Sequence, residues 1–199
     1  APVCSREELN RAVAAAVAAG PGWERDEARR VHALDLMADL LEAHVEELGE
    51  LLTAEQGKPL RAAAYEVTET ARWLRASAAL ELPRQTILDT KVAHAEVRYR
   101  PHGVVAAITP WNFPLLLLGW KLGPALRAGN TVVVKPSPYT PLTTLRAGEL
   151  FQAVLPPGVV NIVSGDDDLG ALLTSHPNIR KISFTGSVAT GKLVAAAAA

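Results

Sequence analysis

From Gly103 onward, short apolar segments rich in β-branched residues alternate with segments of helical periodicity. We expect the apolar segments to be buried strands, at 104–109, 131–135, 159–163 and 179–184. The segments between and after them predict helices, at 115–127, 141–154 and 169–174 and from Ser187 onward. Strands joined by helices form parallel sheets covered by helices, so the sequence predicts an α/β, Rossmann-like sheet with helices on both faces.

The residues before this alternation are predicted to be mostly helical. Ser5 and Glu8 have the spacing of a capping box and predict a first helix. That helix is expected to end at Ala19, because Gly20-Pro21-Gly22 would break it. Apolar residues that recur every three or four positions predict two more helices, one long helix over 26–53 and another over 61–79.

Between residues 86 and 100 the pattern changes to a period of two, with charged or polar side chains at every second position from His94. This alternation predicts a half-exposed strand or a hairpin. The chain therefore divides into an N-terminal helical part at 1–85, a strand or hairpin at 86–100, and a β/α part at 101–199.

Composition excludes several classes of function. The chain has 20 Lys and Arg against 21 Asp and Glu, so it lacks the positive charge that nucleic-acid binding needs. Residues 101–120 carry no Asp, Glu, Lys or Arg, but Pro110 and Pro114 would break a membrane-spanning helix there. Residues 1–10 lack the apolar stretch of a signal peptide, and the single cysteine, Cys4, fits a reducing compartment such as the cytoplasm.

Parallel sheets bind ligands outside the carboxyl ends of their strands. That rule selects four segments of this chain, at 109–113, 135–137, 165–168 and 185–191. In the first of them, two prolines bracket Asn112 and fix its backbone. A rigidly held amide can donate to an oxyanion, whereas the alternative is a rigid turn whose aromatic side chains fill the core.

Three further residue groups have a functional and a structural interpretation. Gly186 and Ser187 lie between a strand and a helix, where they could bind phosphate or simply form a capped turn. Lys135 ends a strand and could reach ribose or phosphate, or could be an ordinary lysine that extends toward solvent. Lys121 could be a buried proton-relay lysine or an exposed helical one. The histidines show no metal-ligand spacing, so no metal site is predicted.

Four segments of the chain resemble the NAD(P)-dependent aldehyde dehydrogenase superfamily in their order and spacing. They are EQGKPL at 55–60, PWNFPLLLLGWKLGPALRAGNTVVVKPSPYTPL at 110–142, LPPGVVNIVSG at 155–165 and ISFTGSVATG at 182–191. The resemblance implies NAD or NADP as cofactor and a small aldehyde as substrate, which is oxidised to a carboxylic acid. It also implies an NAD(P)-binding domain, a catalytic domain and a β-hairpin arm that builds dimers or tetramers, with 86–100 as part of that arm.

The resemblance implies roles for residues that match the family's motifs. Asn112 would supply the side-chain half of the oxyanion hole, and Lys121 would take part in proton relay. Leu117 and Trp120 would line the substrate pocket. The cofactor would be bound by Ile108, Thr109, Pro110, Trp111, Lys135, Ser137, Gly165, Phe184, Gly186 and Ser187.

The chain also departs from the family pattern. Pro138 stands where many NAD-preferring members carry a glutamate that binds the ribose, so the choice between NAD and NADP is open. The family's nucleophilic cysteine and general-base glutamate lie in later segments, and Cys4 does not match the nucleophile's motif. We therefore expect these 199 residues to be an inactive part of a full-length aldehyde dehydrogenase without its catalytic domain. The alternative is a truncated relative that acts as a nucleotide-binding or oligomerisation module.

Overall fold

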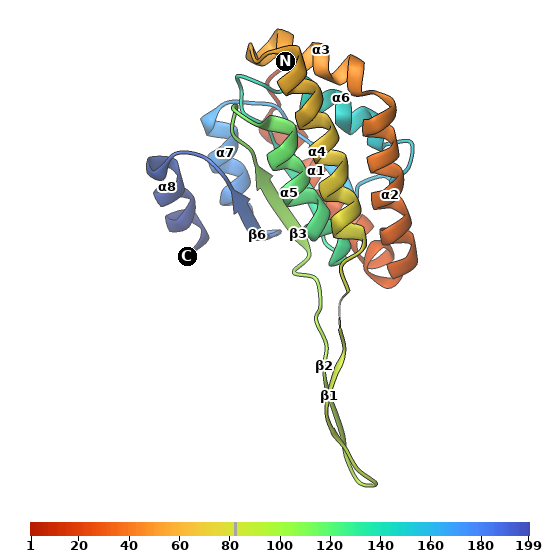
Figure 1. The fold of residues 1–199 in the computed structure, drawn as a ribbon. Helices are drawn as coiled ribbons and strands as arrows, with labels where there is room; N and C mark the ends of the chain where they lie inside the picture. The colour runs from red at the N-terminus through yellow and green to blue at the C-terminus, as the bar shows by residue number, and fades with distance from the viewer. Residues whose placement is uncertain (82) are drawn as a thin grey trace.

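The computed structural model describes residues 1–81 and 83–199. The chain forms the elements α1 (Arg6–Arg25), α2 (Glu27–Ala43), α3 (Val45–Gln56), α4 (Leu60–Ala78), β1 (Gln85–Asp89), β2 (His94–Val97), β3 (Val104–Ile108), α5 (Pro114–Arg127), β4 (Thr131–Lys135), α6 (Leu142–Phe151), β5 (Val160–Ile162), α7 (Asp167–Thr174), β6 (Ile179–Phe184) and α8 (Val188–Ala198). Strands β5, β4, β3 and β6 form, in that order, a parallel sheet flanked by helices (Figure 1). The predicted α/β class is confirmed.

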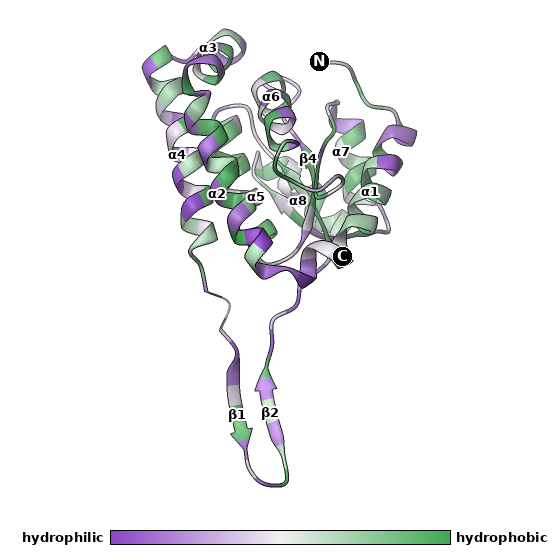
Figure 2. Cartoon of the chain, turned by 90° about the vertical axis from the view of Figure 1, so that its right-hand side faces the viewer, coloured by the Kyte–Doolittle hydropathy of each residue, from purple (hydrophilic) through white to green (hydrophobic). Residues whose placement is uncertain are grey.

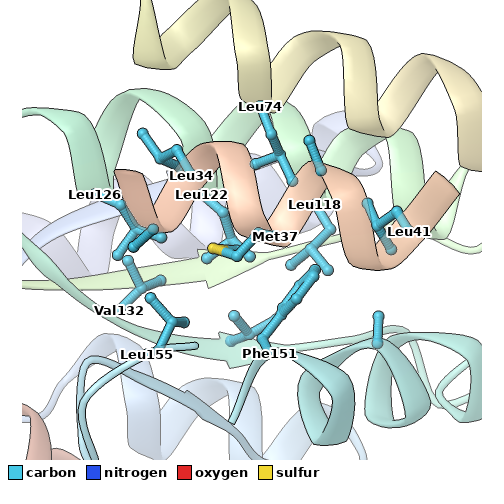
Figure 3. Close-up of a cluster of buried hydrophobic side chains, with 14 of the residues drawn as sticks. Leu34, Met37, Leu41, Leu74, Leu118, Leu122, Leu126, Val132, Phe151 and Leu155 are labelled. Carbon is cyan, nitrogen blue, oxygen red and sulfur yellow. The ribbon is translucent and has the colours of Figure 1, made fainter. Parts of the chain in front are cut away.

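Alternate residues of the central strands face two separate cores. Val105 and Val134 belong to a large core that the sheet shares with α2, α4, α5 and α6. Val104 and Val133 point to the opposite face and pack with residues of α1 and α7. Figure 3 shows the large core, in which side chains from the helices and from the sheet region point toward one another. The labelled side chains are Leu34, Met37, Leu41, Leu74, Leu118, Leu122, Leu126, Val132, Phe151 and Leu155. Because both faces of these strands are buried, apolar residues occupy consecutive positions in their sequences.

The first helix does not end at Ala19, as predicted, but continues through Pro21 to Arg25. Its inner face is buried, and the indole Nε1 of Trp23 donates a hydrogen bond of 3.2 Å to the carbonyl oxygen of Leu126. Proline removes one helical hydrogen bond, and the burial of Trp23 offsets that loss. The capping box of Ser5 and Glu8 is formed as predicted.

The predicted long helix over 26–53 is divided at His44 into α2 and α3. His44 has φ −118° and ψ 23°, and its ring Nδ1 lies 2.8 Å from the carbonyl oxygen of Leu40. Helices α2 and α3 both pack mainly against α4 and also contact α6, whereas α2 additionally packs against α5. No glycine or proline marks this break, so the apolar pattern alone could not indicate it.

Residues 85–97 form an antiparallel hairpin, as the alternating pattern allowed, and it projects from the body of the molecule (Figures 1 and 2). Every residue of β1 is exposed, and Val92 at the turn has 95% of its surface exposed. The hairpin contacts no other secondary-structure element extensively in the described part of the chain.

Among the described residues, no helix has the length and apolar character needed to cross a membrane. The uncharged stretch at 101–120 instead forms β3, the turn after it and the first half of α5.

We predict that Leu122→Ala will destabilise the protein by about 3 kcal/mol, because it leaves a cavity in the large core. Leu122 is 1% exposed and belongs to the core of Figure 3. Denaturant unfolding measures the effect, and Leu80→Ala, at a half-exposed leucine, serves as the control. An equal loss of unfolding free energy in the two variants would contradict the prediction that Leu122 stabilises the protein through its burial in the large core.

Candidate functional site

A hollow of about 790 Å³ lies at the carboxyl ends of β3, β4 and β6. The strand register creates it, because Ile108 at the end of β3 pairs with Lys135 on one side and Phe184 on the other. Most of the predicted site residues line it, namely Ile108, Thr109, Pro110, Trp111, Asn112, Leu117, Lys135, Ser137, Phe184, Gly186 and Ser187. The structure therefore brings residues of all four segments selected from the sequence to one place.

Lys135 is a buried cation at the floor of the hollow, with 4% of its surface exposed. Its Nζ makes one long hydrogen bond of 3.4 Å, to the carbonyl oxygen of Pro136. Burial lowers the pKa of the Lys135 amine, and the nearby carboxylates of Asp167 and Asp166 partly oppose that shift. Such a lysine is available to bind a ligand, and the interpretation as a lysine extending into solvent is wrong.

Lys121 and Thr185 connect α5 to the loop after β6. The Lys121 Nζ donates a hydrogen bond of 2.7 Å to the Thr185 hydroxyl, and Thr185 lines the hollow. Partial burial lowers the pKa of the Lys121 amine. The lysine is therefore neither fully exposed nor among the residues that line the hollow.

The turn between β6 and α8 is closely packed around Phe184. A Cβ atom on Gly186 would lie 2.5 Å from Cζ of the Phe184 ring, so only glycine fits without movement of that ring. The Ser187 hydroxyl accepts a hydrogen bond from the Thr190 backbone N–H, which confirms the predicted cap. Ser187 and Thr190, at the start of α8, line the hollow, and the N-terminus of a helix is where anions commonly bind.

Asn112 lies in the turn between β3 and α5, directly before the N-cap Phe113 and the N1 residue Pro114. Its side chain is exposed at the hollow, and no described residue forms a hydrogen bond with its side-chain amide. Two prolines restrict the turn, so the amide is held in place while remaining free to donate. This arrangement is what an oxyanion site needs.

Two side chains that the sequence interpretation missed contact this turn. The Glu66 carboxylate in α4 accepts hydrogen bonds from the backbone N–H groups of Leu115 (2.9 Å) and Leu116 (3.1 Å). Glu66 also forms an ion pair with Lys58, whose Nζ donates to the carbonyl oxygen of Asn112 at 2.9 Å. The one signal in the sequence was the segment EQGKPL, which contains Lys58 but carried no assigned role.

Besides Lys121, two predicted residues lie outside the hollow. Gly165 is buried beneath Leu169, where a Cβ atom would come within 2.6 Å of a leucine methyl group. Trp120 is exposed on α5, and its ring packs against that of Trp73 with centroids 5.3 Å apart. Tyr139 also lines the hollow, and it lies outside the segments selected from the sequence. The hollow is further lined by residues of the selected segments for which no individual contact was predicted, namely Asp166, Asp167, Asp168 and Thr190.

We predict that Lys135→Met will stabilise the unliganded protein by about 1 kcal/mol at neutral pH, because it removes a poorly paired buried charge. The folded chain releases the Lys135 proton at lower pH than the unfolded chain does, since burial lowers the folded-state pKa. The variant's advantage in the free energy of unfolding should therefore shrink as the pH rises above the lowered pKa of Lys135 in the folded protein. Denaturant unfolding at several pH values measures it, and a difference that grows with pH would contradict the argument.

Comparison with known proteins gives a consistent result over the whole chain. The model of the aldehyde dehydrogenase family matches residues 1–199. The mitochondrial succinate-semialdehyde dehydrogenase of Arabidopsis thaliana is 47% identical over 97% of this chain and 38% of its own length. The crystal structure of PnpE from Pseudomonas sp. WBC-3 has 40% identity and a TM-score of 0.95, over 98% of this chain and 42% of its own.

The aldehyde dehydrogenase from Bacillus cereus, solved as its NAD+ complex, gives 40% identity and a TM-score of 0.93 over 98% of this chain and 41% of its own. The chain thus spans about two fifths of the length of the relatives that it matches. Family match, identity and fold lead to one conclusion: the chain belongs to the aldehyde dehydrogenase family.

Proposed function

We propose that the protein containing this chain oxidises an aldehyde to a carboxylic acid with NAD or NADP. The observation that carries the proposal is the unengaged amide of Asn112, held by a rigid turn at the edge of the hollow that contains Lys135. The relatives are named as aldehyde dehydrogenases, and the Bacillus cereus structure contains NAD+.

The residues present fit a dinucleotide. The Thr109 hydroxyl is buried without a hydrogen-bond partner among the described residues, and the Lys135 amine is nearly so. Lys135 and Ser137 would bind ribose, and the start of α8 at Gly186 and Ser187 would bind phosphate. Ile108, Pro110, Trp111 and Phe184 would form the walls around the cofactor, and Gly165 would support the neighbouring loop.

The overall reaction balances as aldehyde, water and NAD(P)+ giving carboxylic acid, NAD(P)H and a proton. The bound nicotinamide supplies the hydride acceptor. Addition of a nucleophile to the aldehyde carbon moves an electron pair onto the carbonyl oxygen. The Asn112 amide donates a hydrogen bond to that oxygen and stabilises the negative charge as it develops. Leu117, and Trp120 in the complete protein, would contact the aldehyde side chain.

Lys121 would hold a proton near this centre through Thr185. Its amine is partly buried, its pKa is lowered, and its hydrogen bond of 2.7 Å ends on a residue that lines the hollow. We place the proton at the Lys121 Nζ, from which it can pass through the Thr185 hydroxyl.

These 199 residues would supply the cofactor site and the oxyanion donor, but not the nucleophile. Cys4 does not line the hollow, and its backbone N–H is bonded to the carbonyl oxygen of Ser164. We therefore propose that residues 1–199 bind nucleotide without turnover when separated from a catalytic domain. An unpaired cysteine is compatible with the cytoplasm.

The β1–β2 hairpin is the proposed site of self-association into dimers or tetramers. A two-stranded hairpin is marginally stable alone in water, and this one exposes Ile87, Leu88 and Val92. Contact with a second copy would bury these side chains.

We predict that Asn112→Ala will lower kcat about 100-fold to 1000-fold, the cost of removing an oxyanion donor. The dissociation constants of NAD and NADP should stay unchanged, because Asn112 would act on the substrate oxygen. Steady-state kinetics of the full-length protein with a panel of aldehydes, and cofactor titration, measure both. Asn178→Ala, at the opposite end of β6, is the matched control. Wild-type protein that binds cofactor but oxidises no aldehyde would refute the proposed activity.

A further inference from the structure

We infer that Lys58 and Glu66 act together as positioning residues that fix the Asn112 turn for catalysis. The inference rests on the proposed function and deepens it. It concerns two side chains that reach the turn from outside the β/α part of the chain. One precedes α4, and the other lies within it.

Lys58 has three partners, and two of them belong to the turn. Its Nζ donates to the Asn112 carbonyl oxygen at 2.9 Å and lies 4.3 Å from the centre of the Phe113 ring. The third partner is the Glu66 carboxylate. The Lys58 side chain is only 10% exposed, so these contacts are shielded from water and are stronger than at an open surface.

Glu66 holds the other end of the turn. One carboxylate oxygen accepts the N–H groups of Leu115 and Leu116, in the first turn of α5, and the other contacts Lys58. Helix N-termini carry unsatisfied N–H groups and partial positive charge, so a carboxylate there is favourable. The Glu66 side chain is completely buried, and its carboxylate contacts the Lys58 ammonium group and two backbone N–H donors.

The two residues thus hold Asn112 from both sides. Lys58 fixes the backbone oxygen of Asn112, and Glu66 fixes the backbone N–H groups three and four residues later. Fixing the backbone directs the Asn112 side chain into the hollow without using its amide. A displacement of about 1 Å at such a site costs about 100-fold in rate.

Glu55 provides a comparison within the same molecule. Its carboxylate accepts the N–H groups of Leu142 (2.7 Å) and Thr143 (3.0 Å), at the start of α6. This is the same capping geometry, yet it involves no lysine and no contact with Asn112. Lys58 is therefore more than part of a helix cap, because it links the cap of α5 to the backbone of Asn112.

The test is a set of variants in the full-length protein. Lys58→Met should lower kcat about 10-fold to 100-fold with cofactor affinity unchanged, and Lys58→Arg should restore part of the loss. Combined with Asn112→Ala, Lys58→Met should cause no further loss, since it would act only through Asn112. Arg75→Met, which breaks two solvent-accessible ion pairs elsewhere, is the control.

Lys58→Met leaves the buried Glu66 unpaired, so a second variant guards against failure to fold. Lys58→Met with Glu66→Gln removes both charges and retains an oxygen that can cap α5. Either variant should show the Asn112 turn displaced in a crystal structure, a result that requires no turnover.

The outcomes separate the inference from the proposed function. The positioning role would be overturned if Asn112 did not move in these variants. It would also be overturned if Lys58→Met lowered kcat by the same factor in the wild-type protein and in Asn112→Ala. A wild type that oxidises no aldehyde would refute the proposed function alone, because the crystal structures still decide whether Lys58 and Glu66 hold the turn.

Discussion

Strand β3 is hydrogen bonded along both edges, to β4 and to β6, and this pairing determines where the site lies. The pairing continues past the strand ends: Thr109 N–H donates to the Lys135 carbonyl oxygen, and Thr185 N–H donates to that of Ile108. Because all three strands are parallel, the segments that follow them emerge side by side. The hollow is therefore a consequence of the topology, and the side chains on those segments decide its chemistry.

Two carboxylates from the helical part, the half-buried Glu55 and the buried Glu66, hold the loops that the sheet brings together. Glu55 caps α6, which follows the Ser137 loop, and Glu66 caps α5, which follows the Asn112 turn. Glu55 lies 87 residues from Leu142, and Glu66 lies 49 residues from Leu115, yet both carboxylates come from one short region around EQGKPL. The N-terminal helices thus do more than cover the sheet. They hold the two loops of the hollow at their helix starts.

The sheet and the strand-end loops could be predicted from the sequence, because local patterns of residues encode them. The apolar segments predicted β4 and β6 with the bounds that the structure has. Proline and glycine predicted the turns at Asn112 and Gly186. The predicted helix bounds were wrong where tertiary packing determines them, as in the continuation of α1 through Pro21 and the break between α2 and α3 at His44. The sequence also could not show that Lys58 meets Asn112, since 54 residues separate them and nothing local indicates the contact. The roles of the individual site residues remain predictions.

The shared location of Glu55, Lys58 and Glu66 limits how this region can be redesigned. An engineer who exchanges the Asn112 turn for that of a related enzyme would leave its anchors behind in another part of the chain. A functional graft has to carry residues 58–66 together with residues 110–116, although the two stretches are far apart in sequence. The unit that can be transplanted is spatial and discontinuous, and loop libraries built from contiguous segments would miss it.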